Sequence, residues 1–590
     1  MKELLQTKYE KLQHICELKS YPNSKIYPLI KNMIISFTKK CNNPAIWCYG
    51  KHTKMLMTDF IFELKNVNFI IDNGIGNIAG SGFEIINESS ILEKKIDGII
   101  ISSKKYRDEI VCNLKKNYSD IPYLDIYAEL EKNGYYLTVE YYAKDHPSSR
   151  YSSLNGLQRS FLQKKGTEDC KDSLKKILNI YIEIKDFKSA IKYASKLVGL
   201  SNDTWAYELL RQLKEIYNLQ LEALQQINED NVIMLCVDGL RRKEVCKKYM
   251  MNLYTYIKDN MYYCTNAYSV STSTFESLIP AYSENDDLRT GYFNTNVIEA
   301  DNCRFIKEAK RQKRKICFYT DGIDYVKDES ILVKRHAQTA TEKLWDFTLD
   351  ASGEKNGLFY IHILYESHYS YPNPYTIDEI ITEGTNIIFD YLEHNGGQIR
   401  TDYNMQQKDS LRYLDDIIAP LLENLQCRMV LFADHGNILI DKGTELKSIE
   451  KTKYTFHEDL IQIPLAVKSP EIAIRTDDTL ASLMEINTIV IALMKKENFQ
   501  LDKNNYIKVL RSEIYNPDFR YLYKKTHNER GLLAFEVFLF RDGYKLAVYS
   551  DGTVELYLSE TDTEISDMKI KNKLWKEIKD KVTVCDKFDL

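Results

Sequence analysis

The hydrophobic positions of residues 1 to 145 switch between the spacing of a strand and the spacing of a helix. Residues 45–74 (AIWCYGKHTKMLMTDFIFELKNVNFIIDNG) predict a strand, a helix and a second strand, and residues 96–117 (IDGIIISSKKYRDEIVCNLKKN) repeat that order. Such alternation is typical of a parallel sheet with helices packed on it. We therefore predict a Rossmann-like α/β domain over residues 1–145.

The first turn of this domain contains Gly50 but no glycine-rich phosphate fingerprint. We therefore favour a structural or sugar-recognition role over binding of a dinucleotide cofactor. Asp72 and Asn73 follow the second predicted strand, where parallel sheets bind ligands, although a turn explains these residue types equally well.

The pattern changes at residues 146–228, where apolar residues recur at spacings of three and four. This spacing predicts amphipathic helices. We interpret the segment as a helical spacer between domains, with a hairpin that docks a partner as the alternative.

Residues 229–505 return to α/β alternation, and residues 506–590 contain two Asp-Gly turns between alternating strands. The predicted fold class is therefore α/β. It has a central sheet with helices on both faces, the N-terminal Rossmann-like domain, the helical spacer and a small C-terminal antiparallel subdomain. The main predicted strands of the central sheet lie in residues 231–241, 313–322, 357–367 and 428–436.

Composition narrows the functional classes. The chain has 590 residues, enough for three or four domains, and its net charge is -5 with 80 basic and 85 acidic residues. These charges are well mixed, so no basic surface indicates nucleic-acid binding. The 12 cysteines show no zinc-ribbon spacing and suit a reducing compartment. The sequence shows neither a signal-peptide pattern nor a long apolar span, and we expect a cytoplasmic protein whose oligomeric state stays open.

The candidate chemistry lies at the ends of two predicted strands and in one hydroxyl-rich loop. Asp238 ends the apolar run VIMLCV, and Asp434 and His435 end the run MVLFA. Thr274 lies in the Ser/Thr-rich segment 267–280 (AYSVSTSTFESLIP). Oxygen ligands from Asp238, Asp434 and Thr274, with the imidazole of His435, would suit a zinc or manganese ion that makes the hydroxyl a nucleophile.

Each of these segments alone has a simpler interpretation. A strand-terminal aspartate is more often a turn or helix-cap residue, and a Ser/Thr run is more often a polar loop or a helix N-cap. Their order and their shared context of strand followed by loop favour a common site.

Residues 230 to about 570 resemble the alkaline phosphatase superfamily, in the sulfatase-like branch that includes phosphoethanolamine and phosphoglycerol transferases. In that family the core opens with a strand that ends in a metal-binding acid, which Asp238 matches, and a DHG strand end supplies further ligands, which Asp434 and His435 match. The family nucleophile lies in a T-x-x-S motif before a proline. Thr274 fits this motif, but the proline falls one place late, so Thr272 remains an alternative.

The resemblance also assigns two histidines. His368 stands ahead of a Pro-Tyr pair, where the family has a substrate-side histidine, and His457 stands where a second one precedes the next strand. A lone histidine is otherwise more often a surface or core residue. Glu366 is a possible further ligand. Arg241 and Arg242 follow Asp238 directly and are the nearest cations that could bind a phosphate. The alternative is that both are solvated charges at the end of a strand.

The resemblance implies an α/β sheet like that of alkaline phosphatase and a metal-dependent enzyme. The C/S-x-P-x-R segment that sulfatases need is absent from the sequence, so we disfavour sulfate ester hydrolysis. The leading hypothesis is a phosphotransferase. It would move a substituted phosphoryl group from a soluble activated donor to a sugar hydroxyl during capsule synthesis, through a phosphothreonine at Thr274, with His368 and His457 assisting. A phosphodiesterase or phosphatase that uses water is the alternative, and a non-catalytic scaffold is the third hypothesis.

Overall fold

The computed structural model describes thirteen parts of the chain: residues 1–16, 23–73, 83–103, 106–133, 135, 147–163, 169–200, 203–290, 295–368, 371–377, 399–437, 456–514 and 529–585. Contacts divide the chain into two compact units. The larger unit comprises Met1–Leu12, Arg150–Lys334 and Gln338–Leu590, and the smaller comprises Gln13–Ser149 and Arg335–Ala337. The domain boundaries expected from the sequence stay predictions.

The smaller unit is built on a five-stranded sheet with the order β3-β2-β1-β4-β5, in which all neighbouring strands are parallel. Its isoleucine-rich strands bury their side chains against the helices, as the apolar runs of the sequence require. Its strands are β1 (Pro44–Trp47), β2 (Phe69–Ile71), β3 (Glu84–Ile86), β4 (Gly98–Ile101) and β5 (Tyr123–Asp125). Its helices are α2 (Asn23–Thr38), α3 (Lys51–Asp59), η1 (Glu88–Ser90), α4 (Arg107–Asn117) and α5 (Ile126–Lys132).

The two polar residues after β2 each accept a backbone hydrogen bond. A side-chain oxygen of Asp72 accepts a hydrogen bond from the backbone N–H of Tyr49 at 2.9 Å, and that of Asn73 accepts one from the N–H of Glu88 at 3.0 Å. These bonds join the end of β2 to the segments that follow β1 and β3, and neither the turn nor the ligand interpretation of the two residues is tested by them.

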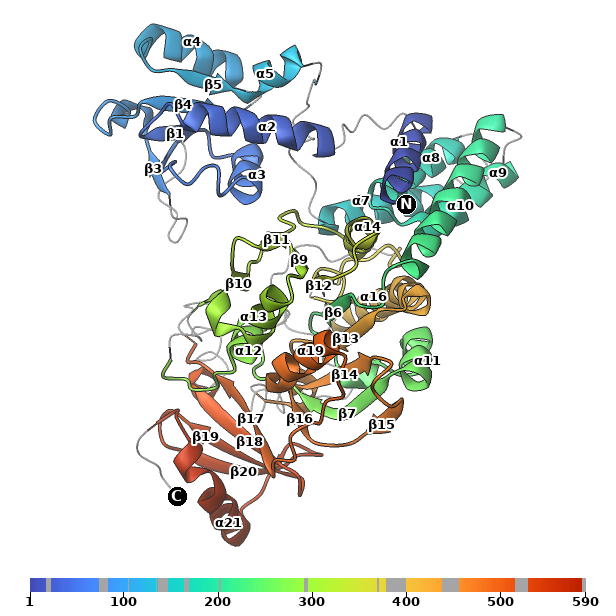
Figure 1. Ribbon diagram of the computed structural model, residues 1–590, viewed down its shortest axis with the longest axis vertical. Helices are drawn as coiled ribbons and strands as arrows, with labels where there is room; N and C mark the ends of the chain where they lie inside the picture. The colour runs from blue at the N-terminus through green and yellow to red at the C-terminus, as the bar shows by residue number, and fades with distance from the viewer. Residues whose placement is uncertain are drawn as a thin grey trace. The chain divides into compact units, whose positions relative to one another are not determined.

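The larger unit includes a group of helices before its sheet. Helix α8 packs on α9 and α9 packs on α10, with apolar faces at the predicted spacing (Figure 1). The helices are α1 (Lys2–Ile15), α7 (Pro147–Gln163), α8 (Asp169–Glu183), α9 (Phe187–Leu200) and α10 (Thr204–Gln225).

The central sheet of the larger unit has nine strands. Its order is β11-β9-β12-β6-β13-β14-β7-β15, with β16 also paired to β7. Strand β14 is antiparallel to both of its neighbours, and the other described pairs of this sheet are parallel. The strands are β6 (Val232–Val237), β7 (Tyr262–Tyr268), β9 (Lys315–Tyr319), β11 (Ile331–Val333), β12 (Gly357–Ile363), β13 (Arg428–Phe432), β14 (Gln462–Lys468), β15 (Arg475–Asp477) and β16 (Ala481–Ser482). Two short strands, β8 (Ile298–Glu299) and β10 (Val326–Lys327), pair separately.

Helices cover both faces of this sheet (Figure 1). Helices α12 (Thr274–Ser283), α13 (Arg304–Arg311) and α19 (Ile486–Lys495) pack together, and α19 contacts β6 and β13. Helices α11 (Met251–Asn260), α14 (Ala340–Ala351) and α16 (Ile399–Asn424) form the other layer. The shorter helices are η2 (Arg242–Glu244), η4 (Ala300–Asn302), α18 (Glu458–Ile461) and η6 (Leu483–Glu485).

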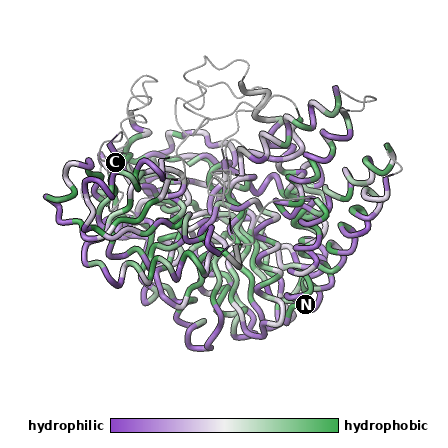
Figure 2. The backbone as a smooth tube through the Cα atoms, turned by 90° about the horizontal axis from the view of Figure 1, so that it is seen from above, coloured by the Kyte–Doolittle hydropathy of each residue, from purple (hydrophilic) through white to green (hydrophobic). Residues whose placement is uncertain are grey.

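Because both faces are covered, the middle strands are mostly apolar, with His362 of β12 and Arg428 of β13 as buried polar residues. Every residue of β6, β12 and β13 is buried. Figure 2 shows these hydrophobic positions gathered on strands near the centre of the view, with hydrophilic positions on the outer turns. Burial on both faces explains the continuous apolar runs in the sequence.

The C-terminal part of the larger unit is a five-stranded antiparallel sheet, as predicted. Gly543 and Gly552 take positive φ angles of 85° and 89° in the two Asp-Gly turns, a conformation that favours glycine. The elements are β17 (Tyr506–Arg511), η7 (Glu529–Leu532), β18 (Phe535–Phe540), β19 (Tyr544–Tyr549), β20 (Val554–Leu558), β21 (Thr563–Glu564), α21 (Met568–Ile578) and η8 (Lys579–Lys581).

The predicted fold class is confirmed: the chain is mixed α/β, with a mainly parallel central sheet and a small antiparallel one. A search of the helices in the described residues finds none with the length and apolar character needed to cross a bilayer.

Lys545 connects the antiparallel sheet to α18. Its ammonium group has no exposed surface and lies 2.6 Å from Asp562 and 2.7 Å from Glu458. Removal of the cation would leave two carboxylates buried without their partner, which is strongly destabilising.

We predict that Lys545→Met lowers the free energy of unfolding by about 3–5 kcal/mol, measured by urea denaturation followed with tryptophan fluorescence. The matched control is Lys573→Met, because Lys573 is 68% exposed and lies 3.9 Å from Asp542. An unchanged midpoint in Lys545→Met would contradict this role.

Candidate active site

Two aspartates lie side by side where neighbouring parallel strands end. Strands β6 and β13 are paired so that Cys236 lies opposite Phe432. Asp238 and Asp434 each come two residues later, and both side chains are fully buried. The register of the two strands therefore brings both carboxylates to one edge of the sheet, where α/β folds place their ligands.

Helix α12 brings a threonine hydroxyl to this pair. Thr274 is the first residue of the helix, and its Oγ1 lies 3.1 Å from Asp238 Oδ2 and 3.3 Å from His435 Nε2. Of the two threonines that the sequence left open, Thr274 rather than Thr272 makes these contacts. The structure thus brings together Asp238, Thr274, Asp434 and His435, the residues of the predicted metal site.

Ser277 fixes helix α12 to the end of strand β13. Its hydroxyl donates to the backbone carbonyl of Asp434 at 2.6 Å and accepts a hydrogen bond from the N–H of Val270 at 3.2 Å. The serine of the T-x-x-S motif therefore holds the first turn of α12 against the DHG segment, which positions Thr274.

Close backbone contacts explain the glycines of the site. A Cβ atom on Gly436 would lie 2.0 Å from the carbonyl oxygen of Asp459, and one on Gly239 would lie 2.2 Å from the Asn437 amide. That amide donates to the Gly239 carbonyl at 3.0 Å. Both turns are therefore packed too tightly for a larger residue.

The two carboxylates perturb each other. Burial raises the pKa of Asp434, and the neighbouring charge of Asp238 raises it further. Burial acts in the same direction on Asp238, but the nearby rings of His362 and His368 outweigh it and lower the pKa of that carboxyl. Burial would lower the pKa of His435, yet the charges of both aspartates raise it. The site therefore favours positive charge next to these acids.

The donor atoms fit a divalent metal ion. Asp238, Asp434 and His435 offer ligand atoms that lie within 4.8 Å of one another. Among the described residues, Asp238 Oδ1 and Asp434 Oδ2 are buried oxygens without a hydrogen-bond partner. Such acceptors are costly in a protein interior unless a cation offsets them.

The orientation of His435 supports the same conclusion. Its Nδ1–H donates to the carbonyl of Gly436 at 2.7 Å, which leaves Nε2 as a lone-pair donor. That nitrogen faces Asp434 Oδ2 at 3.4 Å. Two lone pairs that face each other need a proton or a metal ion between them. Carboxylate, imidazole and hydroxyl ligands together suit zinc or manganese.

The other predicted residues lie in different surroundings. His368 follows β12, and its charge is close enough to affect the pKa of Asp238. His457 caps α18: its Nδ1 accepts from the N–H of Asp459 at 3.1 Å, and its Nε2 lies 3.7 Å from Asp562. Glu366 accepts from the Tyr151 hydroxyl at 2.6 Å and from the Ala340 N–H at 2.8 Å. Both bonds reach Oε1, and Oε2 is a buried oxygen without a hydrogen-bond partner in the described part of the chain, so the further ligand at Glu366 stays a prediction.

Arg241 corrects an expectation from the sequence. It is neither solvated nor available to a phosphate, because it is 4% exposed and its guanidinium donates to Glu244 at 2.8 Å and to Asp459 at 3.0 Å. Both pairs support the loop that follows Asp238.

His362 was missed by the sequence reasoning. It lies inside β12, it is 1% exposed, and its Nε2 is 3.4 Å from Asp238 Oδ2. Its Nδ1 is 2.9 Å from the hydroxyl of Tyr325. The available signal was a histidine inside the apolar run GLFYIHI of a predicted strand.

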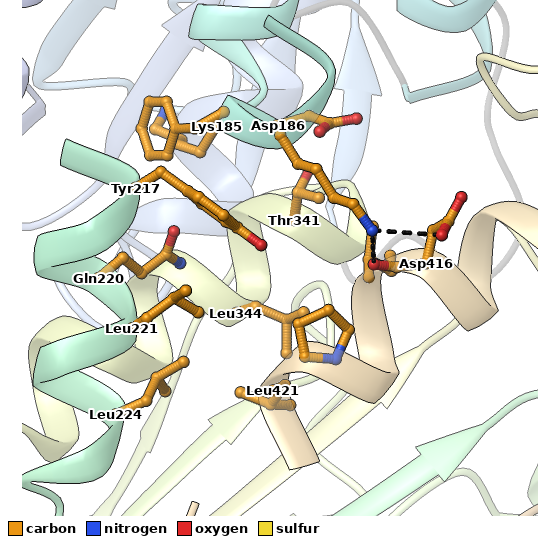
Figure 3. Close-up of a pocket in the computed structure, with 14 residues that line it drawn as sticks. Lys185, Asp186, Tyr217, Gln220, Leu221, Leu224, Thr341, Leu344, Asp416 and Leu421 are labelled. Atoms are coloured by element: carbon orange, nitrogen blue, oxygen red, sulfur yellow. Dashed lines mark hydrogen bonds and ion pairs between the residues drawn. The ribbon is translucent and has the colours of Figure 1, made fainter. Parts of the chain in front are cut away.

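A separate pocket lies between α9, α10, α14 and α16 (Figure 3). Leucines line one part of it, and near its other end Lys188 donates to Asp416 at 3.2 Å. None of the residues predicted to act in catalysis lines this pocket. Its labelled apolar residues are Leu221, Leu224, Leu344 and Leu421.

Comparison with known proteins finds no matching family model and no matching curated protein. Among solved structures, the chain is similar to the C-terminal periplasmic domain of EcEptC from Escherichia coli, with 13% identity over 45% of this chain and 81% of that one and a TM-score of 0.31. The chain is also similar to the soluble domain of lipooligosaccharide phosphoethanolamine transferase A from Neisseria meningitidis. The identity is 14% over 45% of this chain and 87% of that one, with a TM-score of 0.32.

A third similar structure is the phosphonate monoester hydrolase SpPMH from Silicibacter pomeroyi, with 12% identity over 60% of this chain and 96% of that one and a TM-score of 0.41. At these identities and TM-scores the similarity assigns neither a substrate nor a reaction to this chain. The arrangement of the site residues has to supply that evidence.

We predict that Zn²⁺ stabilises the protein by binding to Asp238 and Asp434. An ion at about 100 times its Kd adds about 2.7 kcal/mol to the free energy of unfolding, which raises the melting temperature in differential scanning fluorimetry. Asp434→Asn should lose this gain, because the amide offers a weaker ligand and cannot balance the charge of the ion.

Asp415→Asn is the matched control, since Asp415 is also a buried aspartate, but both of its oxygens accept backbone N–H bonds, from Leu253 at 2.7 Å and from Asn252 at 3.1 Å. It should keep the response to zinc. An equal zinc response in Asp434→Asn and in the unaltered protein would refute the metal site.

Proposed function

We propose that this chain is a metal-dependent phosphotransferase whose nucleophile is Thr274. The observation that carries the proposal is the hydroxyl of Thr274 at the start of a helix, in contact with Asp238 and His435, beside buried carboxylate oxygens that lack partners. A hydroxyl, two acids and an imidazole in this arrangement form an activated nucleophile next to a cation site.

The reaction has two displacements. Thr274 Oγ1 attacks the phosphorus of the donor. The bond between that phosphorus and the donor oxygen breaks, and a phosphothreonine forms. The threonine proton passes to a carboxylate oxygen of Asp238, which already accepts its hydrogen bond. An acceptor hydroxyl then attacks the same phosphorus and loses its proton to solvent, the bond to Thr274 breaks, and Asp238 returns its proton to the threonine oxygen. A bound divalent ion, which we expect to be zinc or else manganese, would lower the pKa of the hydroxyl and offset charge on the transferred group.

The helix start favours an anionic group at Thr274. Thr274 opens the ten-residue helix α12, and the N–H groups of a first helical turn have no partners within the helix. Together with the helix dipole they favour a negatively charged phosphoryl group at this end. The electrostatics therefore support phosphorus chemistry at the threonine.

The leaving oxygen of the donor takes on negative charge, and we assign the Nε2–H of His457 to donate a hydrogen bond to it. Because Nδ1 of His457 accepts from the N–H of Asp459, the ring proton of the neutral form is on Nε2. The side chain of His457 is 42% exposed, and its Nε2 lies 3.7 Å from an oxygen of Asp562. We assign His368 to bind the oxygens of the transferred phosphoryl group. Its ring is close enough to Asp238 to lower the pKa of that carboxyl.

We further propose that the donor is a water-soluble activated compound, such as an alcohol linked to a nucleotide diphosphate, used in the cytoplasm. The proposed acceptor is a sugar hydroxyl of a surface polysaccharide such as a capsule. The parallel sheet of the smaller unit supports this proposal, because such sheets bind nucleotides and sugars at their strand ends. A phosphodiesterase or phosphatase is the second candidate, since water can attack the same phosphothreonine.

We predict that Thr274→Ala lowers kcat on a chromogenic phosphodiester by about 10³-fold or more, because the nucleophile is lost. Intact-mass measurement after incubation with CDP-linked donors should show an adduct on the unaltered protein and none on Thr274→Ala. The control is Thr272→Ala, which removes a hydroxyl from the same loop. If Thr274→Ala still turned over the phosphodiester and still formed the adduct, Thr274 would not be the nucleophile.

The acceptor decides between the two candidate activities. We predict that adding a glycan acceptor to the adduct transfers the group to the glycan faster than it is hydrolysed, as measured by the mass of the glycan. Release of the group to water at the same rate with and without acceptors would favour the hydrolase.

A further inference from the structure

His362 is a buried polar side chain that the proposed chemistry does not yet use. It lies on β12 with its ring opposite Cys236 of β6 in the strand register. The ring is nearly parallel to that of Tyr360, with centroids 6.0 Å apart. A buried imidazole needs partners for both nitrogens, so the groups that face them define its role.

The partner of Nδ1 is the hydroxyl of Tyr325, at 2.9 Å. Tyr325 is fully buried and has a φ angle of 34°, in the left-handed region that bulky residues rarely adopt. Strained backbone of this kind persists where the surrounding structure holds it, often at functional sites. The tyrosine is therefore held with its hydroxyl against the imidazole ring.

Nε2 faces the carboxylate of Asp238, although the two are not within hydrogen-bond geometry. Nε2 lies 3.4 Å from Oδ2, the same oxygen that accepts the hydroxyl of Thr274 at 3.1 Å. A carboxylate oxygen only accepts, so this contact places the ring proton on Nε2 and makes the Tyr325 hydroxyl the donor to Nδ1. Oδ2 accepts the hydrogen bond of Thr274, whereas Asp238 Oδ1 and His362 Nε2 are both buried atoms without a hydrogen-bond partner among the residues that the structure describes.

We propose that His362 is a positioning residue for the metal site. Its Nε2–H fixes the rotation of the Asp238 carboxylate, so that Oδ1 is presented to the ion, and Tyr325 fixes the tautomer of the ring. This inference rests on the proposed function. Groups behind a metal ligand that orient it in this way commonly change metal affinity or activity by about 10–100-fold.

Cys236, His362 and Asp434 also lie close enough to hold an ion themselves. In that case His362 would be a ligand and not a positioning residue. The stoichiometry of bound metal distinguishes the two roles, because removal of a ligand abolishes its ion whereas removal of a positioning group weakens binding at the neighbouring site.

The test compares two amides of similar size at one position. Glutamine places its N–H₂ near Nε2 and can still donate to Asp238, whereas asparagine reaches only to the level of Nδ1 and Tyr325. Zn²⁺ affinity would be measured by competition with a chromogenic chelator, and kcat and KM on a chromogenic phosphodiester. Visible spectra of the Co²⁺-loaded proteins would report the ligand arrangement.

We expect His362→Asn to weaken Zn²⁺ binding by about 10–100-fold and to lower kcat with little change in KM. His362→Gln should stay within about threefold of the unaltered protein in both quantities, since it keeps the donor that orients the ligand. The Co²⁺ spectrum should change in the asparagine variant alone.

Tyr325→Phe should weaken Zn²⁺ binding in the unaltered background but not in His362→Gln, because its effect passes through the imidazole. Tyr360→Phe is the matched control, as it removes a buried hydroxyl from the residue that stacks on the same ring. It should leave Zn²⁺ affinity unchanged.

Equal Zn²⁺ affinity and kcat in His362→Asn and His362→Gln would overturn the positioning role, and so would the loss of one bound ion in both variants. These outcomes are distinct from failure of the proposed function. That failure would appear as an unaltered protein that binds no Zn²⁺ and as turnover that does not depend on Thr274.

Discussion

The structure depends on the burial of two like charges at adjacent strand ends. Asp238 and Asp434 follow neighbouring parallel strands in register, and water reaches neither carboxylate. Two buried negative charges repel and lack hydration, so a fold that keeps both must supply positive charge. His435 contributes part of it, because both aspartates raise the pKa of its ring, and the carboxylate oxygens without partners among the described residues are available to a cation.

The surrounding turns are shaped by the same requirement. Gly436 lets the DHG turn lie against the backbone of α18, and Ser277 ties the first turn of α12 to the carbonyl of Asp434. Thr274 therefore reaches the acids from a helix that is fixed at both ends of its first turn. The chemistry we propose follows from this arrangement, because a hydroxyl held next to a cation site and at a helix start is suited to attack phosphorus.

The sequence predicts those parts of the site that depend on local pattern. Apolar runs that end in Asp238 and Asp434 predict parallel strands, and parallel strands bring their ends together. The roles of His362 and Arg241 depend on contacts with residues distant in sequence. A histidine inside an apolar strand has no local feature that distinguishes a core residue from a positioning one, and Tyr325 reaches it from a separate turn. The pairing of Arg241 with Asp459 requires the position of α18, which no spacing along the chain provides.

X-ray diffraction with anomalous data at the zinc and manganese absorption edges, on crystals grown with each ion, tests the metal site most directly. The account predicts one anomalous peak within about 2.0–2.3 Å of oxygen or nitrogen atoms from Asp238, Thr274, Asp434 and His435. A protein that crystallises with these side chains in place but shows no peak among them, or binds its metal elsewhere, would contradict it.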